Sequence, residues 1–314
     1  MVLNLIRRAL GLESTPIQSV SGSNSDAFVH RTWTSVEGLA LHARDYAPAG
    51  GATRLPVICL HGLTRNAADF EDVAPWMAAR GRRVLAVDFR GRGGSAWDPQ
   101  PMNYLPPAYA GDVLGLMDAA GIGRAIFVGT SLGGIVTMVL ASLRPAAIAG
   151  AVLNDVGPTL NPEALKRIGA YTGQDPGVAD WAGAAAYARQ VNAAAFPGYG
   201  AAQWDAFARR LFTEGSGGRP RLNYDPEIIA PIRAAGPGAL APDITPLFLT
   251  LATGRPLLLI RGGLSDLLDA PRADAMRALA PQMAYAEVPT AGHAPMLDEP
   301  EALEALAAFL DAAP

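Results

Sequence analysis

The feature that most constrains this chain is a series of six short apolar runs, most of them separated by amphipathic stretches. The runs read "LPVICL", "RVLAVD", "AIFVG", "AGAVLND", "PLLLIRG" and "AYAEVP" in chain order. Helical spacing of apolar residues is found between them, over residues 67–79, 107–119, 132–143 and 271–279. Strands that are apolar on both faces and alternate with helices are typical of a parallel sheet covered on both sides. The sequence therefore predicts an α/β fold.

The start of the chain follows two other patterns. Residues 27–47 alternate between apolar and polar and predict a two-strand hairpin that turns at Glu37 and Gly38. This hairpin would add antiparallel strands at one edge of the sheet. Residues 1–25 form an N-terminal extension whose apolar residues are spaced for one face of a short helix. We expect this helix to lie against the body, with a membrane-surface or dimer contact as the alternative.

The series of strands is interrupted once, between Pro158 and about Asp243. This segment is rich in alanine, glycine, proline and aromatic residues, which favours helices separated by breaks. A long insertion at one strand–helix connection is usually a lid or a binding element. We therefore expect a core made of residues 1–157 and 244–314, with a helical cap over residues 158–243.

Composition limits the classes of function. The chain has 314 residues, half of them hydrophobic and 17% charged, with a net charge of −4, so it offers no basic surface for nucleic acid. Cys59 is the only cysteine, which excludes an internal disulfide and a cysteine-based zinc site and suggests a buried core thiol. With no secretory signal and no apolar stretch of ~20 residues, we expect a cytoplasmic protein without a spanning segment. The oligomeric state stays open.

The stretch "GTSLGG" carries the strongest functional signal. Gly129-x-Ser131-x-Gly133 follows a predicted strand and opens a predicted helix, which is the context of a nucleophile elbow. In such a turn neighbouring backbones come close, so side chains at 129 and 133 would collide with them. A strained backbone would hold the serine hydroxyl out of the sheet, beside a helix N-terminus that favours developing negative charge.

A serine hydroxyl needs a base, and the base needs an acid. His30 and His42 lie in the predicted hairpin, where an ordinary surface or edge position is expected. His293 follows the last predicted strand in "VPTAGHAP" and is our choice of base. For the acid we favour Asp266, which follows "RPLLLIRG", over Asp155, which we expect to order the start of the insertion.

Further site residues follow from this choice. The backbone N–H groups of Leu132 and Leu63 are expected to form the oxyanion hole. Arg65 lies in the same turn as Leu63 and could hold a substrate carboxylate. The other residues that we expect near the substrate are His61, Trp97, Tyr104, Trp181 and Trp204. We expect no cofactor and no metal, because no ligand cluster is evident.

Together these motifs resemble those of the α/β-hydrolase superfamily: "HGLT", "DFRGRGGS", "GTSLGG", "SD" and "GHAP" occur in order over nearly the whole core. The resemblance implies an eight-stranded, mostly parallel sheet with helices on both faces, an inserted helical cap and a triad of Ser131, Asp266 and His293. Relatives that open epoxides or remove halides use aspartate as the nucleophile, whereas position 131 is serine. The chain is most similar to cap-bearing esterases, lactonases and carbon–carbon bond hydrolases.

The resulting hypothesis is a serine hydrolase that cleaves carboxylic esters of small apolar or aromatic compounds through an acyl-enzyme. The alternatives are a lactonase or a carbon–carbon bond hydrolase in which Arg65 grips a carboxylate. A third hypothesis, from another class, is a sensor that binds a small molecule on the same fold without turnover.

Overall fold

The computed structural model describes residues 18–20, 27–51, 54–235 and 242–314. The helix expected within the first 25 residues lies outside the described residues. Only residues 18–20 of that extension are described, and they form a strand. Across the described part of the chain, no helix combines the length and the apolar character that crossing a bilayer requires.

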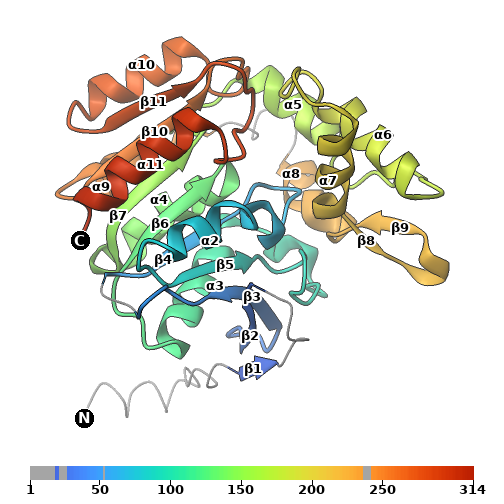
Figure 1. The fold of residues 1–314 in the computed structure, drawn as a ribbon, viewed down its shortest axis with the longest axis horizontal. Helices are drawn as coiled ribbons and strands as arrows, with labels where there is room; N and C mark the ends of the chain where they lie inside the picture. Colours follow the sequence, from blue (N-terminus) through green and yellow to red (C-terminus); the bar gives the residue numbers. More distant parts are fainter. Residues whose placement is uncertain (1–17, 21–26, 52–53, 236–241) are drawn as a thin grey trace.

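One large sheet organises the molecule, with the strand order β1-β2-β3-β5-β4-β6-β7-β10-β11 (Figure 1). The first three strands pair antiparallel with their neighbours, and the remaining strands pair parallel. Their bounds are β1 (Gln18–Val20), β2 (Val29–Thr34), β3 (Ala40–Tyr46), β4 (Val57–Leu60), β5 (Val84–Asp88), β6 (Ala125–Thr130), β7 (Ile148–Asn154), β10 (Leu257–Gly262) and β11 (Ala284–Val288). The predicted α/β fold and the edge hairpin are confirmed. The sheet has one strand more than the eight expected, because β1 extends its antiparallel edge.

Helices cover both faces of this sheet. Buried side chains of α3 (Pro106–Ala119), α4 (Leu132–Leu143), α9 (Thr245–Ala252) and α10 (Ala270–Leu279) belong to the cluster on one face. Those of α2 (Val73–Ala78) and α11 (Pro300–Ala312) belong to the cluster on the other face, together with the short 3-10 helix η1 (Ala67–Phe70). The four predicted helical stretches are thus confirmed, although the first is divided between η1 and α2.

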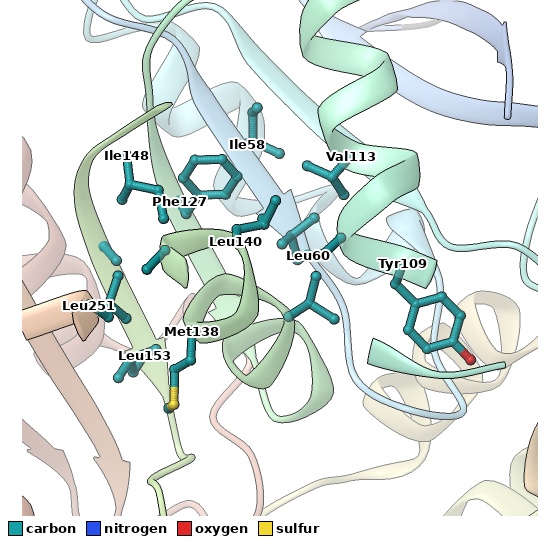
Figure 2. Close-up of a cluster of buried hydrophobic side chains, with 14 of the residues drawn as sticks. Ile58, Leu60, Tyr109, Val113, Phe127, Met138, Leu140, Ile148, Leu153 and Leu251 are labelled. Carbon is teal, nitrogen blue, oxygen red and sulfur yellow. The ribbon is translucent and has the colours of Figure 1, made fainter. Parts of the chain in front are cut away.

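Strand β4 shows why the strand sequences are apolar throughout. Ile58 and Leu60 point into the cluster beneath α3 and α4, whereas Val57 and Cys59 point into the cluster on the opposite face. Figure 2 shows the first of these clusters, in which Leu60 and Val113 lie between the strands and α3. Because successive strand residues face opposite sides, a sheet covered on both sides needs apolar residues at every position. Cys59 is fully buried as expected, and burial raises the pKa of its thiol.

Most of the remaining elements lie in the segment between β7 and β10. They are α5 (Pro162–Tyr171), α6 (Trp181–Asn192), α7 (Ala201–Leu211), β8 (Phe212–Glu214), the 3-10 helix η4 (Ser216–Gly218), β9 (Pro220–Leu222), the 3-10 helix η5 (Pro226–Ile229) and α8 (Ala230–Ala235). Figure 1 shows them gathered on the side of the molecule opposite the C-terminus. The antiparallel ribbon β8–β9 was not predicted, since two strands of three residues are too short to produce a readable alternation.

Candidate active site

Ser131 occupies the turn between β6 and α4. Its backbone has φ 52° and ψ −115°, a conformation that L-residues rarely adopt. The flanking glycines have the expected steric reason: a Cβ on Gly133 would lie 2.0 Å from the Leu60 carbonyl oxygen, and one on Gly129 would lie 2.6 Å from the Gly133 backbone. The turn therefore depends on glycine at both positions, and it places the serine hydroxyl at the N-terminus of α4.

His293 lies beside this hydroxyl, with its Nε2 atom 2.9 Å from Ser131 Oγ. It comes from the loop between β11 and α11, as the sequence predicted. The other ring nitrogen, Nδ1, lies 2.7 Å from Asp155 Oδ2. Because a carboxylate only accepts hydrogen bonds, Nδ1 carries the proton of the neutral ring and Nε2 accepts from the serine. The three side chains form one continuous hydrogen-bonded chain.

The pairing of His293 with Asp266 is wrong. Asp266 is half exposed and forms an ion pair with Arg167 of α5, with Nη2 2.7 Å from Oδ2. Asp155 is fully buried at the carboxyl end of β7, where it also accepts hydrogen bonds from Gly262 N–H at 2.9 Å and Ser265 Oγ–H at 2.6 Å. The "GLSDLL" loop thus turns its serine inward and its aspartate outward. Asp155 was the second candidate for the acid, ranked behind Asp266 because it was expected to order the start of the insertion.

Asn154 is a site residue that the sequence did not reveal. Its backbone carbonyl accepts the Ser131 N–H at 3.0 Å, and its side-chain amide donates to the Pro295 carbonyl at 2.8 Å. The same amide lies 3.0 Å from Thr130 Oγ1. Asn154 therefore fixes the serine turn and the His293 loop relative to each other. Its position at the end of a buried strand beside the serine strand is the only signal that could have indicated this.

Two cavities meet at Ser131. The larger has a volume of about 270 Å³ and is bordered by both predicted oxyanion residues, Leu63 and Leu132. The smaller has a volume of about 90 Å³ and is bordered by Leu63, Arg65 and His293. Leu63 and Leu132 thus lie beside the serine, where the sequence placed them.

Arg65 lies at the smaller cavity, but its charge is already paired. Its Nε lies 2.8 Å from Asp69 Oδ2 and its Nη2 lies 2.6 Å from Asp69 Oδ1, which makes a bidentate ion pair. The guanidinium also lies over the Phe207 ring, 4.0 Å from its centroid. Arg65 is therefore held in place by two partners and does not present an unpaired charge to a ligand.

His61 has a structural position. Its ring is fully buried, with Nδ1 2.7 Å from the Gly62 carbonyl oxygen and Nε2 accepting the Phe89 N–H at 3.1 Å. Burial is the main cause that lowers its pKa to about 4, which keeps the ring neutral. His61 therefore fixes the turn after β4 and does not border either cavity as the described residues outline them.

The four predicted aromatic residues also differ in position. Tyr104 borders the larger cavity, whereas Trp204 is buried in the cluster that joins α6 and α7. Trp181 packs against that same cluster, with Arg209 over its ring. Trp97 is 48% exposed, with Arg221 as a neighbour. Trp181 and Trp204 thus stabilise the segment between β7 and β10. The geometry does not support the prediction that Trp97, Trp181 and Trp204 lie near the substrate.

Among the described residues, no three histidine, cysteine, aspartate or glutamate side chains come together in a way that could hold a metal ion. The described site contains the hydrogen-bonded chain of serine, histidine and aspartate at the point where two cavities meet. It has the parts for nucleophilic attack on a carbonyl group followed by proton transfer.

Comparisons with known proteins agree with this arrangement. A solved alpha/beta hydrolase from Novosphingobium aromaticivorans is 43% identical, covers 92% of this chain and 99% of its own, and superposes with a TM-score of 0.85. The 3-hydroxybutyrate-oligomer hydrolase of Cupriavidus necator is 34% identical over 78% of this chain and 84% of its own length. The 2-(acetamidomethylene)succinate hydrolase of Mesorhizobium japonicum is 28% identical over 82% and 88%.

The relatives thus include hydrolases of different substrates. A model of the alpha/beta hydrolase family matches residues 57–306, from the start of β4 into α11. This match covers most of the chain, including every element that contributes to the site. The chain therefore belongs to the alpha/beta hydrolase family.

Proposed function

We propose that this protein is a serine hydrolase that cleaves carboxylic esters through an acyl-enzyme. The observation that carries the proposal is the continuous hydrogen-bonded chain from Asp155 through His293 to Ser131, at the point where two cavities meet. The buried Asp155 orients the ring and stabilises its protonated form, while His293 takes and returns the proton.

In the first half of the reaction, Ser131 Oγ attacks the acyl carbon while its proton passes to His293 Nε2. The carbonyl oxygen becomes an oxyanion, which the N–H groups of Leu63 and Leu132 stabilise. When the tetrahedral intermediate collapses, the ester C–O bond breaks and His293 gives its proton to the leaving alcohol. The acyl group is then bonded to Ser131.

In the second half, water takes the place of the alcohol. His293 accepts a proton from the water as its oxygen attacks the acyl carbon, and the same backbone donors stabilise the second oxyanion. The bond to Ser131 Oγ breaks, and His293 returns the proton to the serine. The products are a carboxylic acid, an alcohol and the unchanged protein.

We also propose that residues 158–243 act as a cap. Ile168 and Tyr171 of α5, Asn192 of α6 and Phe207 of α7 border the smaller cavity, so this segment supplies one wall of the substrate site. The name of the Cupriavidus relative, an oligomer hydrolase of 3-hydroxybutyrate, supports an ester substrate. The alternative in which Arg65 grips a carboxylate loses its support, because that guanidinium is already paired with Asp69.

Hydrolysis of p-nitrophenyl esters from acetate to decanoate by the wild type and Ser131→Ala tests this proposal. We expect burst release of p-nitrophenol from the wild type and a loss of turnover of about 10⁴-fold or more in the variant. The circular dichroism spectrum and the Tm of the variant serve as its folding control. A wild type that is inert toward every ester, or a well-folded variant that keeps full activity, would refute the proposal and favour a sensor without turnover.

A further inference from the structure

From the two cavities beside Ser131 we infer that the preferred ester is asymmetric: its acyl group is apolar, and its alcohol is polar and uncharged. This inference rests on the proposed function, since it assigns the two sides of the ester to the two cavities. It concerns the class of substrate, whereas the proposed function concerns only the type of reaction.

The position of His293 decides which side of the ester each cavity receives. The leaving oxygen must lie within reach of His293 Nε2, because that atom donates the proton on which departure depends. His293 borders the smaller cavity, and the described lining of the larger cavity does not include it. The alcohol therefore occupies the smaller cavity, and the acyl group extends past Leu132 into the larger one.

The larger cavity has an apolar lining. Aliphatic side chains from several elements, among them α4, α5, η5 and α8, border it: Leu63, Leu105, Leu132, Ile135, Leu160, Leu165, Ile168, Ile228, Ile232, Ile244 and Leu267. With a volume of about 270 Å³, this cavity has room for an acyl chain of several carbons. Each methylene that moves there from water gains about 0.8 kcal/mol, which is about fourfold in kcat/KM.

The two tyrosine hydroxyls at this cavity are already bonded to the protein. Tyr104 Oη lies 2.5 Å from Asp225 Oδ2 and accepts the Asp98 N–H at 2.8 Å. Tyr109 Oη accepts from Arg92 Nη1 at 2.8 Å. A hydroxyl group on the acyl chain would have to compete with these bonds or stay unpaired, which costs free energy in a buried site. The larger cavity therefore selects acyl groups without hydrogen-bonding groups.

The smaller cavity has a mixed lining, in which apolar side chains such as Phe70, Phe196 and Met296 lie beside a cluster of polar ones. Thr64, Arg65, Asp69, Tyr171 and Asn192 border it together with His293, beside the ring of Phe207. The charges of Arg65 and Asp69 neutralise each other, with Nη2 and Oδ1 2.6 Å apart. An added charge of either sign would meet one like charge, whereas a hydroxyl group can accept from one partner and donate to the other. This polar cluster, with Asn192 and Thr64 beside the Arg65–Asp69 pair, favours a short polar alcohol without a net charge.

A pair of isomeric esters tests the assignment. 2-Hydroxyethyl hexanoate has an apolar acyl group and a polar alcohol, while hexyl glycolate has the same atoms with the two arms exchanged. We expect kcat/KM to be at least about tenfold higher for 2-hydroxyethyl hexanoate, after each value is divided by the rate of alkaline hydrolysis. When hexyl glycolate places its hexyl arm in the larger cavity, its leaving oxygen points away from His293.

A variant of the larger cavity adds a second, independent readout. Ile135 borders this cavity one turn into α4, so Ile135→Phe reduces its volume. We expect the ratio of kcat/KM for 2-hydroxyethyl hexanoate to that for 2-hydroxyethyl acetate to fall about tenfold or more. Leu143→Phe is the matched control, since Leu143 ends the same helix with 55% of its surface exposed, and the ratio should stay constant.

The outcomes separate this inference from the proposed function. A wild type that hydrolyses both isomers through Ser131 at equal normalised rates, or prefers hexyl glycolate, overturns the inference and leaves ester hydrolysis standing. The inference is also contradicted if the ratio of kcat/KM for the hexanoate to that for the acetate is the same in Ile135→Phe as in the wild type. No hydrolysis of any ester, including p-nitrophenyl acetate, overturns both.

Discussion

Two aspartate–histidine pairs in this protein have nearly the same geometry and different surroundings. Asp155 Oδ2 lies 2.7 Å from His293 Nδ1, and Asp88 Oδ2 lies 2.7 Å from His42 Nδ1. Both aspartates are buried, and both follow the same pattern of a carboxylate that fixes one ring nitrogen. The pairs differ in the group that lies beside the other ring nitrogen, Nε2.

His293 Nε2 meets the Ser131 hydroxyl beside two cavities, whereas His42 Nε2 meets His30 Nδ1 at 2.7 Å. Gly94 packs against this ring, since a Cβ there would lie 2.8 Å from His42 Cγ, and His42 lies outside the described lining of both cavities beside Ser131. An acid–histidine pair therefore indicates chemistry only when a nucleophile and an open space complete it. The second pair instead ties strands β3 and β5 to the turn that follows β4, since Asp88 Oδ1 accepts the Ala67 N–H at 2.6 Å.

The largest expected effect tests the acid of the first pair. Asp155→Asn should lower kcat on the preferred ester by about 10³- to 10⁴-fold, because an amide no longer holds the histidine in the required tautomer. The control is Asp266→Asn, which removes only a half-exposed ion pair with Arg167 and should change kcat less than about twofold. Steady-state kinetics of both variants check this comparison. The reverse order of effects would restore Asp266 as the acid.

The second pair should govern stability. Burial alone would raise the pKa of Asp88, but hydrogen bonds from His42 and Ala67 hold the pKa below its ordinary value. Asp88→Ala leaves these buried donors without an acceptor and should lower the free energy of unfolding by about 3–5 kcal/mol, measured by urea denaturation. Ser131→Ala, in contrast, should change the free energy of unfolding by less than about 1 kcal/mol. Equal free energies of unfolding for the two variants would contradict a structural role for the Asp88–His42 pair.

A smaller effect concerns His61, which lies between His42 and Asp88 in the sequence. Burial lowers its pKa from 6.5 to about 4, so the unfolded chain binds a proton on His61 more readily than the folded chain between these values. The contribution of the neutral ring is therefore complete above about pH 6.5 and is lost as the pH falls toward 4. The wild type should lose up to about 3 kcal/mol more than His61→Gln over this range.

Urea denaturation of both proteins at several pH values measures this difference. The His61→Gln variant is the appropriate comparison because its amide can still accept the Phe89 N–H. Parallel stability curves for the two proteins between pH 6.5 and 4 would contradict a buried, neutral His61.

Much of the fold was predictable, because each buried strand and each helix has its own local pattern. Ser131 was predictable for a similar reason: its flanking glycines and its strand–helix context are local. The choice between Asp155 and Asp266 was not, since both follow a buried strand and both precede His293. What separates them is the direction that each side chain takes from its turn. Asp155 has a positive φ of 55° and points inward, and Ser265 takes the inward position in the later loop.

The aromatic residues of the segment between β7 and β10 show a second limit. Their number suggested a substrate pocket, but Trp204 and Phe212 form part of a small core for that segment and border neither of the described cavities beside Ser131. An inserted segment of this kind needs an apolar centre of its own to hold its helices together. Composition therefore could not separate residues that line a pocket from residues that stabilise its wall.

The end of β7 determines which parts of this molecule can change in sequence without moving the catalytic side chains. Asn154 holds the serine turn and the histidine loop, and the next residue, Asp155, holds the histidine itself. One dipeptide at the carboxyl end of β7, beside the serine strand β6, therefore sets the alignment of nucleophile and base. Helix α5 begins only after it, at Pro162. Insertions, deletions and substitutions after this dipeptide can therefore change the shape of the substrate cavities. The positions of the Ser131 and His293 side chains stay the same.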